Sequence, residues 1–325
     1  MINELCKYIY EMPVLSIKLR ATAVEDIFLH DHNGSLFRGV LGLAMKGACG
    51  CVIEKECMNC PSANSCFYYN VFETPRDKGS ELMTKQSHYP HPFVIRPPYG
   101  GSRKVVSDDD FCFELMVIGN TVKIWNNYIK CVEIMGEIGL NSGKDKFILN
   151  EAASCSASGR TKILYKNGDY YNAVPDLIRL RDIYSSIGTK KPDKIKINFI
   201  TPLRIQSDHK LLENIDFRTF AAGLIRRLTN LNYFHNTREK AKIDFKKIFE
   251  IAEGVKVIDE SLKTVSIERF SNRQDRRHRL PGLTGYVTFS GERLSDFYPL
   301  LQFGEFTHVG KSTSFGFGQY NLEIL

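Results

Sequence analysis

The residues best suited to chemistry lie in the segment 304–320, GEFTHVGKSTSFGFGQY. Glycine permits positive φ and leaves space beside the backbone, so a loop containing four glycines lets backbone amides approach a phosphate group. In this loop His308 can transfer protons, and Lys311 can stabilise negative charge. The other candidate donors are the backbone of Gly310 and the hydroxyls of Ser312, Thr313 and Ser314. The segment predicts a loop that binds the phosphate of a nucleotide or of a nucleic acid.

An ATP-binding P-loop is one alternative, because residues 310–312 spell Gly-Lys-Ser. That motif requires a glycine five residues before Gly310, and Glu305 stands there. A P-loop also opens a helix, whereas the alternation of polar and apolar residues over 315–325 predicts a closing strand. Both observations disfavour ATP binding.

A second candidate is the arginine-rich segment 268–280, ERFSNRQDRRHRL. Its arginines are Arg269, Arg273, Arg276, Arg277 and Arg279. Guanidinium groups grip phosphates, and the interleaved Ser271, Asn272 and Gln274 can reach base edges. Charge runs usually form solvated surface hairpins, and that alternative stays open. We favour nucleic-acid binding because the glycine-rich loop follows in the same half of the chain, and we expect the two segments to form one surface.

A cluster of four cysteines follows the first predicted helix, with one pair spaced as C-x-x-C. The four are Cys51, Cys57, Cys60 and Cys66. Four thiolates at this spacing can close a tetrahedral site, so structural zinc is the first prediction and an iron–sulfur cluster the second. Cys49 could replace Cys51, and four ordinary thiols remain the alternative because only one C-x-x-C is present. A metal here would stiffen an inserted loop over residues 49–72 without taking part in catalysis.

Composition sets the class of protein and of partner. The chain has 325 residues, a net charge of +7 and a pI near 8.8, which favours polyanionic partners. No apolar run reaches the eighteen residues or so of a membrane span, and the first residues do not resemble a signal peptide. Nine cysteines, an odd number, are typical of a reducing compartment. We therefore expect a cytoplasmic protein that has no contact with membranes.

The elements that position these residues follow from the hydrophobic pattern. The first half predicts a strand, a turn, a helix, an extended edge segment, a strand, a helix and a hairpin, at residues 14–29, 30–35, 36–49, 88–98, 111–118, 122–138 and 159–171. Ser35 is the predicted N-cap of the first helix. This order is that of a ferredoxin-like domain.

A charged stretch containing Gly188 and Pro192 predicts a boundary between domains 1–188 and 189–325. The second domain repeats the order of the first, with elements at 195–205, 217–233, 265–270, 283–290, 294–303 and 315–325. The predicted fold class is α+β, with two tandem ferredoxin-like domains and a four-cysteine insertion in the first.

Five segments together carry a resemblance to a known family. They are LFRGVLG at 36–42, the cysteine loop at 51–72, FSNRQ at 270–274, PGLTGYVTFSG at 281–291 and the glycine-rich segment at 304–320. In these segments the chain resembles the CRISPR-associated endoribonucleases of the RAMP (repeat-associated mysterious protein) superfamily, which process precursor crRNA.

The resemblance implies RNA-recognition-motif-like domains and metal-independent cleavage of CRISPR repeat RNA at the base of a hairpin. The ribose 2′-OH would attack the adjacent phosphate and leave 2′,3′-cyclic phosphate and 5′-hydroxyl ends, which requires RNA because DNA lacks that hydroxyl. No cofactor would be needed for catalysis. The implied partners are CRISPR repeat RNA or precursor crRNA, other CRISPR effector proteins and a second copy in a homodimer.

The family's catalytic histidine occurs at more than one place, so we assign it by position. His308 is the first candidate for acid or base, because it lies three residues before Lys311, which would stabilise the transition-state charge. His30 and His32 are the second, because many relatives carry the histidine in the turn before the first helix. Arg38, on that helix, joins the predicted RNA-binding residues. A RAMP subunit that binds crRNA in an effector complex without cutting it is the alternative function.

Overall fold

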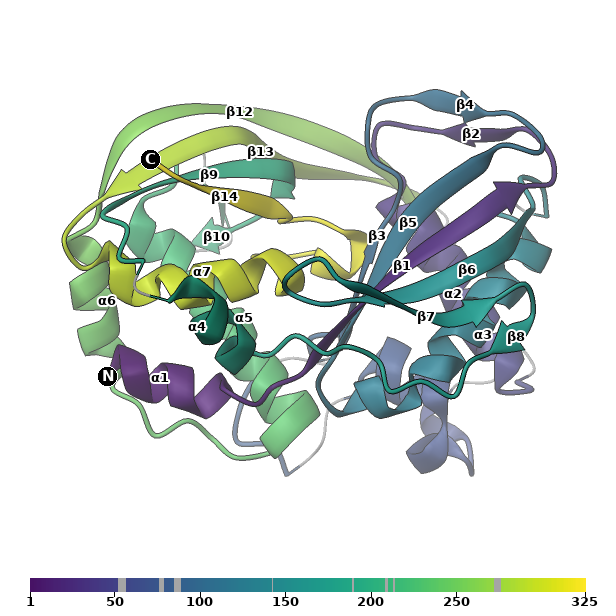
Figure 1. Cartoon of the computed structure of the whole chain (residues 1–325), viewed down its shortest axis with the longest axis horizontal. Helices are drawn as coiled ribbons and strands as arrows, with labels where there is room; N and C mark the ends of the chain where they lie inside the picture. The colour runs from purple at the N-terminus through teal and green to yellow at the C-terminus, as the bar shows by residue number, and fades with distance from the viewer. Residues whose placement is uncertain are drawn as a thin grey trace. The chain divides into compact units, whose positions relative to one another are not determined.

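The computed structural model describes residues 1–51, 57–75, 79–84, 89–141, 143–188, 190–207, 210–212, 214–271 and 276–325. The chain forms two compact units (Figure 1). The N-terminal unit comprises Pro13–Ile178 and Tyr233–Lys240, and the C-terminal unit comprises Met1–Met12, Arg179–Asn232 and Ala241–Leu325. The division differs from the boundary expected after residue 188, because the first helix of the chain and the helix that follows Ile178 both pack with the C-terminal unit.

The N-terminal unit is built on a six-stranded antiparallel sheet in the order β3-β5-β1-β6-β7-β8. The strands are β1 Val14–Ala23, β3 Phe93–Arg96, β5 Asp110–Ile118, β6 Phe147–Cys155, β7 Thr161–Lys166 and β8 Asp169–Tyr170. Helix α2 (Gly34–Ala48) follows β1, and α3 (Trp125–Ile138) follows β5. With β1 between β5 and β6, this strand-helix-strand-strand-helix-strand path is ferredoxin-like, as predicted for this half.

The alternation in β1 decides which face of this sheet is covered. Ile17 and Leu19 have no exposed surface, whereas Lys18 and Arg20 between and beside them are exposed. On the buried face the helices pack against the strands, and Phe37 of α2 meets Phe113 of β5 edge to face, with 5.2 Å between ring centroids. One face of the sheet thus carries the core and the other carries charged side chains.

The C-terminal unit repeats the topology. Its sheet has the order β12-β13-β9-β14, with strands β9 Lys194–Leu203, β12 Lys256–Ser271, β13 Arg276–Ser290 and β14 Tyr320–Ile324. Helix α5 (Phe217–Asn232) follows β9, and α7 (Leu294–Thr307) follows β13. The α+β class and antiparallel pairing are confirmed in this half as well.

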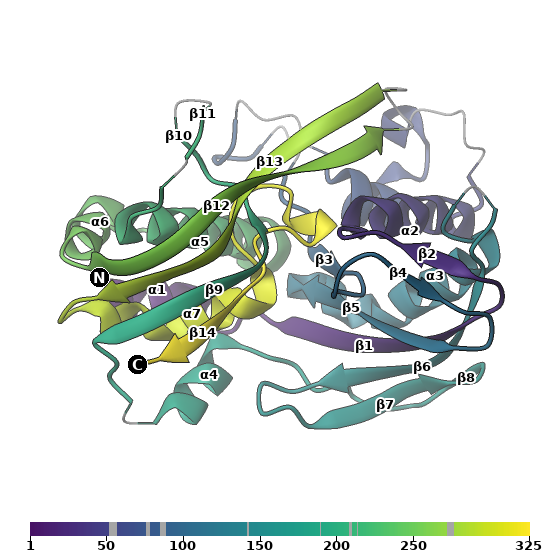
Figure 2. The ribbon, with the colours of Figure 1, turned by 90° about the horizontal axis from the view of Figure 1, so that it is seen from above.

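The β12–β13 hairpin is longer than the strands predicted at 265–270 and 283–290. Only the part of β13 from Leu283 to Ser290 pairs with β9, so the distal part of the hairpin extends past the sheet (Figure 2). The prediction for the outer strand was too short because residues 256–261 are all exposed and lack the alternation that marks a half-buried strand.

Short elements account for most of the other differences. Sequence patterns missed the strand β6, whose place in the ferredoxin-like order was given to the hairpin at 159–171. They also missed the helices α1 Ile2–Ile9, α4 Leu180–Ile187 and α6 Phe245–Glu253, and the strands β4 Arg103–Val105, β10 Gln206–Ser207 and β11 Lys210–Leu211. The first predicted strand is divided into β1 and β2 (Ile27–Leu29). One-turn helices are η1 Cys57–Asn59, η2 Ala63–Ser65, η3 Tyr69–Glu73, η4 Gly119–Ile124, η5 Tyr233–Thr237 and η6 Thr313–Phe315. The predicted N-cap was wrong: Asn33 is the N-cap of α2, and Ser35 lies inside the helix.

No helix within the described ranges combines the length and the apolar character that a membrane span requires.

Candidate functional site

The glycine-rich loop is packed more tightly than a phosphate-binding loop. Backbone amides that would have faced a phosphate donate to backbone carbonyls instead. Val309 donates to Gly318 over 3.1 Å, Lys311 donates to Arg204 over 2.8 Å, and Gly318 donates to Pro202 over 3.0 Å. The expectation that these amides cradle a phosphate is therefore wrong for these three groups, because the loop uses them to hold itself against the end of β9.

The glycines serve this close packing. Gly310 has φ 84°, and a Cβ there would stand 2.5 Å from the carbonyl oxygen of Arg204. Gly318 has φ 69°, and a Cβ there would overlap the carbonyl oxygen of Val309. Both positions require a residue that has no side chain and tolerates a left-handed backbone.

His308 lies inside the fold. Its side chain has no exposed surface, and its Nδ1 lies 3.0 Å from the carbonyl oxygen of Phe317. It ends α7 with φ 61°, one residue after Thr307, whose carbonyl accepts a 2.6 Å hydrogen bond from Nε of the buried Arg227. Burial lowers the pKa of Arg227, but an arginine keeps its proton at neutral pH and suits the negative end of a helix. The prediction of His308 as acid or base is not supported by this position, because RNA cannot reach a sealed imidazole.

Lys311 and Ser312 reach solvent beside Arg204, which follows β9, and we call these three side chains the exposed loop edge. Lys311 is exposed and donates to the Gln206 side chain. Arg204 donates from Nη1 to the Ser312 hydroxyl over 2.8 Å and from Nε to the Pro281 carbonyl over 2.9 Å. Thr313 and Ser314 were predicted to be donors as well, but they are almost completely buried.

Arg204 is the functional candidate that the sequence reasoning missed. It follows β9 directly and joins the exposed loop edge to β13, two residues from Arg279. Partial burial lowers its pKa without removing its charge at neutral pH. In the sequence, Arg204 was visible only as an arginine at the end of a predicted strand. The pairing of that strand with β13 and β14 had to be known before Arg204 could be placed beside the loop and the hairpin.

The arginine-rich segment forms the far half of the β12–β13 hairpin. Arg269 lies on β12, and Arg276 and Arg277 lie on β13. Arg279 is exposed, and its Nε lies 3.5 Å from a carboxylate oxygen of Glu268 on the opposing strand. Arg273 and Gln274 were predicted to bind RNA and lie outside the described residues. The hairpin and the loop edge meet at Arg204, but the burial of His308, Thr313 and Ser314 reduces the single surface expected from the sequence to this edge.

The second pair of candidate histidines lies in the N-terminal unit, in a turn at residues 30–33 that we call the histidine turn. Asn33 fixes its backbone: its side-chain oxygen accepts from the His30 amide over 2.9 Å, and its Nδ2 donates to the His30 carbonyl over 2.7 Å. Asn33 is buried, whereas His30 is exposed and His32 is half-buried. The turn therefore presents the His30 imidazole to solvent from a fixed backbone at the start of α2, whereas Nε2 of His32 is buried.

A polar and basic strand borders this turn. β2 pairs with β4 so that Leu29 faces Arg103, which puts Arg103 beside the turn. Ser102 donates to the Asp31 carboxylate over 2.8 Å. Arg103 is exposed, and so is Lys104, whose Nζ lies 2.5 Å from Asp26. The neighbourhood can thus offer proton transfer and positive charge at one place on one unit.

Arg38, on α2, is engaged within the N-terminal unit. Its Nη2 donates to Nε2 of His91 over 3.1 Å, and its guanidinium carbon lies 4.2 Å from the centre of the Phe72 ring. This half-buried arginine holds the inserted segment against α2, so its predicted contact with RNA has no support from its position.

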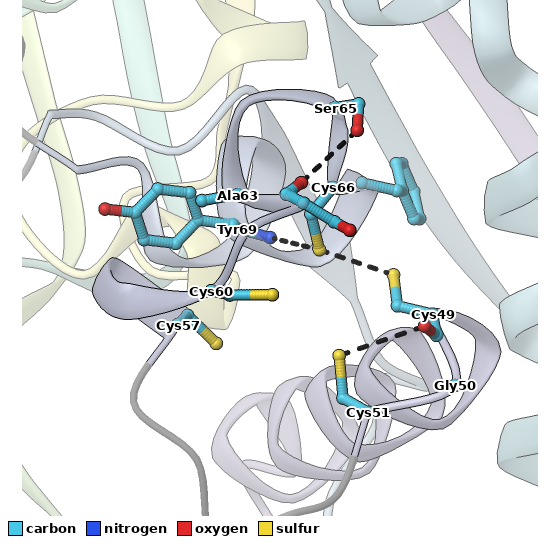
Figure 3. Close-up of a pocket in the computed structure, with 11 residues that line it drawn as sticks. Cys49, Gly50, Cys51, Cys57, Cys60, Ala63, Ser65, Cys66 and Tyr69 are labelled. Atoms are coloured by element: carbon cyan, nitrogen blue, oxygen red, sulfur yellow. Dashed lines mark hydrogen bonds between the residues drawn. The ribbon is translucent and has the colours of Figure 1, made fainter.

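The inserted segment brings five cysteines to one cavity of about 530 Å³ (Figure 3). They are Cys49, Cys51, Cys57, Cys60 and Cys66. Burial raises the pKa of the thiols of Cys49 and Cys57. Within the described part of the chain, no three or more His, Cys, Asp or Glu side chains are arranged so that they could hold a metal ion. The predicted zinc site is thus not confirmed, although its cysteines do gather.

Two family models match parts of the chain. Residues 197–320 match the family model of the CRISPR-associated endoribonuclease Cas6, and residues 12–177 match a family model described as an N-terminal domain. The Cas6 match lies within the C-terminal part of the chain and covers less than half of it, so this part is similar to the CRISPR-associated Cas6 endoribonucleases. The resemblance to RAMP-type processing endoribonucleases is thereby confirmed.

Solved Cas6 structures have a similar fold. Thermus thermophilus Cas6 superposes with a TM-score of 0.57 at 13% identity over 96% of this chain and 99% of its own. A product complex of the same Cas6 gives a TM-score of 0.57 at 14% identity, with 96% and 100% covered. A partial Cas6-RT-Cas1–Cas2 complex gives 0.55 at 13% identity over 96% of this chain and 46% of that chain. No curated protein matches the sequence. At these identities the structures establish the Cas6-like fold alone.

Proposed function

We propose that this protein acts as a Cas6-type endoribonuclease, which cleaves CRISPR repeat RNA within precursor crRNA by attack of a ribose 2′-OH on the adjacent phosphate and without a catalytic metal ion. One base would remove the 2′-OH proton, one acid would protonate the leaving 5′-oxygen, and cations would stabilise the phosphorane charge. The products would carry 2′,3′-cyclic phosphate and 5′-hydroxyl ends. The match of residues 197–320 to the Cas6 endoribonuclease model supports the reaction class.

The observation that carries the mechanism is the histidine turn. It is the place within the described residues where two predicted catalytic histidines, His30 and His32, lie close to an exposed arginine, Arg103. Asn33 holds the backbone of the turn, so the exposed His30 imidazole needs little reorganisation when RNA binds, whereas Nε2 of His32 is buried and must become accessible before it can act. We assign proton transfer to His32, with His30 as the second group, and stabilisation of charge to Arg103.

Binding of the RNA backbone falls to the C-terminal unit in this proposal. The exposed loop edge and Arg279 offer three cationic side chains, and the predicted hairpin arginines would extend them. Guanidinium groups bind phosphate in a fixed geometry and contribute most of their affinity without reading sequence.

The reaction is tested with purified protein and a repeat RNA in the presence of a chelator. Cleavage at one site, with a cyclic phosphate on the 5′ product, is the expected result. The same RNA carrying a single 2′-deoxy nucleotide at that site is the matched control, and it should bind with equal affinity and stay intact.

Tight binding of the unmodified RNA without cleavage would contradict the proposal and favour the alternative of a non-catalytic RAMP subunit. Cleavage that requires added Mg²⁺ would overturn the metal-independent mechanism while leaving the endoribonuclease activity.

We also propose that the protein works beside other CRISPR proteins. The support is that a similar fold forms part of a Cas6-RT-Cas1–Cas2 complex. Co-purification with the products of neighbouring CRISPR genes would test this.

A further inference from the structure

The cavity in the inserted segment is the strongest feature that RNA cleavage does not use. Five of the nine cysteines line it, and their sulfur atoms turn toward the same space in Figure 3. The remaining four are scattered over the fold, from buried Cys6 and Cys131 to exposed Cys112. Several thiols that lie close together without forming a disulfide are typical of a site that binds a metal ion.

The distance between two of these sulfurs fits a shared metal ion. Sγ of Cys49 and Sγ of Cys66 lie 3.6 Å apart. A disulfide would bring them to about 2.0 Å, whereas two thiolates on one tetrahedral zinc, at about 2.3 Å from it, lie about 3.8 Å apart. The pair joins the end of α2 to the residue after η2, seventeen residues later, so it already has the spacing of one edge of a tetrathiolate site.

Cys66 has the hydrogen bond that a bound thiolate requires. The backbone amide of Tyr69 donates to its sulfur over 3.5 Å. An N–H directed at sulfur stabilises the anion and fixes its orientation, which is the role of outer-shell groups around metal ligands.

The C-x-x-C pair supplies the opposite edge. Cys57 and Cys60 flank a one-turn helix that is closed by a 3.1 Å hydrogen bond from the Cys60 amide to the Cys57 carbonyl. Such a tight turn presents both sulfurs on one side. Figure 3 shows them on the other side of the cavity from Cys49 and Cys51, with Cys66 between the two sides.

Cys51 is the fifth cysteine of the cavity, and we do not assign it as a ligand. Sγ of Cys51 lies 3.9 Å from the carbonyl oxygen of Cys49, whereas the sulfur of Cys49 itself lies beside that of Cys66, so Cys49 is the better placed of the two to share an ion with Cys66. Sequence spacing alone favoured Cys51 as a ligand, with Cys49 as its substitute; the structure reverses that preference.

We propose that Cys49, Cys57, Cys60 and Cys66 bind one zinc ion. Because no three such side chains among the described residues are already placed to hold an ion, the proposal requires the Cys57–Cys60 turn and the Cys49–Cys66 pair to come together when zinc binds. Each thiol releases its proton to solvent as it coordinates. Four protein ligands leave no open position, so the ion is structural and ties the end of α2 to the inserted segment.

The first test measures zinc by elemental analysis in protein purified under reducing conditions without chelator. One equivalent of zinc per chain is the expected result. Cobalt taken up in its place should give the visible absorption of tetrahedral thiolate coordination. Iron with inorganic sulfide, a Cys49–Cys66 disulfide, or absence of any metal both as purified and after anaerobic titration with zinc would each overturn the proposal.

A second test separates the ligands from their neighbour. Cys49→Ser and Cys66→Ser should each lose most of the zinc, whereas Cys51→Ser should retain it. Cys112→Ser, on the exposed face of β5, is the matched control and should also retain it. Loss of zinc in Cys51→Ser with retention in Cys49→Ser would overturn this ligand set.

Thermal unfolding gives a third readout that is independent of RNA. Chelator should lower the melting temperature of the parent protein and of Cys51→Ser, and should have no effect on Cys66→Ser. Because none of these measurements involves cleavage, they can fail while the proposed endoribonuclease activity stands, and the reverse is also true.

Discussion

The histidine turn and the glycine-rich loop present the same residue type in opposite settings. In the loop, His308 is sealed among packed residues and bonds to the Phe317 carbonyl. In the turn, His30 is exposed on a backbone that Asn33 holds in place. The comparison teaches that glycines and a histidine in one short segment indicate tight packing as readily as chemistry, and that exposure separates the two roles.

The largest expected effect lies in the histidine turn. His32→Ala should slow single-turnover cleavage by roughly a hundredfold or more, because a general acid or base contributes about 10²–10⁴ in rate. Affinity for the 2′-deoxy RNA should stay near that of the parent. His30→Ala, measured beside it, should lose less. Equal rates for His32→Ala and parent would remove His32 from the reaction and break the comparison.

A pair of glycines sharpens the contrast in packing. Gly318→Ala should lower the free energy of unfolding by roughly 3 kcal/mol or more, since it adds a steric overlap to a left-handed backbone. Gly101, in the loop that leads to β4, also has positive φ (83°), but a Cβ there would meet no atom within 4 Å, so Gly101→Ala should cost about 1 kcal/mol. Urea unfolding measures both. Similar losses would mean that the glycine-rich loop is as open as the other.

His308 itself should matter for stability and not for catalysis. His308→Asn keeps a residue that tolerates positive φ but loses packing and the bond to Phe317, so the free energy of unfolding should fall by about 2 kcal/mol. Cleavage per folded molecule should stay within roughly threefold of the parent. A hundredfold loss of cleavage in folded protein would restore His308 as a catalytic residue.

The smallest effect concerns the exposed loop edge. Arg204→Ala should weaken RNA binding by about 1 kcal/mol and reduce the slope of log affinity against log salt by about one, because one phosphate contact is lost. Arg218→Ala is the matched control: this exposed arginine pairs with Glu253 on α6. An unchanged salt slope for Arg204→Ala would take the loop edge out of the RNA-binding surface.

Local patterns predicted much of the fold because its central elements have clear periods. The alternation in β1 and the helical spacing in α2 and α5 are both visible in the sequence, and they give the ferredoxin-like order in each half. The outer part of β12 was missed because it is exposed on a projecting hairpin, where pairing with β13 replaces burial as the stabilising contact.

The candidate RNA-binding and metal-binding residues were less predictable, because contacts between residues distant in the sequence bring them together. Arg204 is positioned by hydrogen bonds to Pro281 and Ser312, which lie 77 and 108 residues away in the sequence. Cys49 is placed beside Cys66, seventeen residues later. No local pattern marks either residue, since distance along the chain says nothing about separation in space.

By itself, the sequence determined the α+β class, the clustering of cysteines and the resemblance to a family of RNA-processing enzymes, because composition, period and motif are properties of neighbours along the chain. Only the tertiary structure decided that His308 is buried, that the loop amides are already bonded and that Cys49 pairs with Cys66. Burial and long-range hydrogen bonds arise when strands distant in sequence pack together, and they decide which of several similar side chains can reach a substrate or a metal ion.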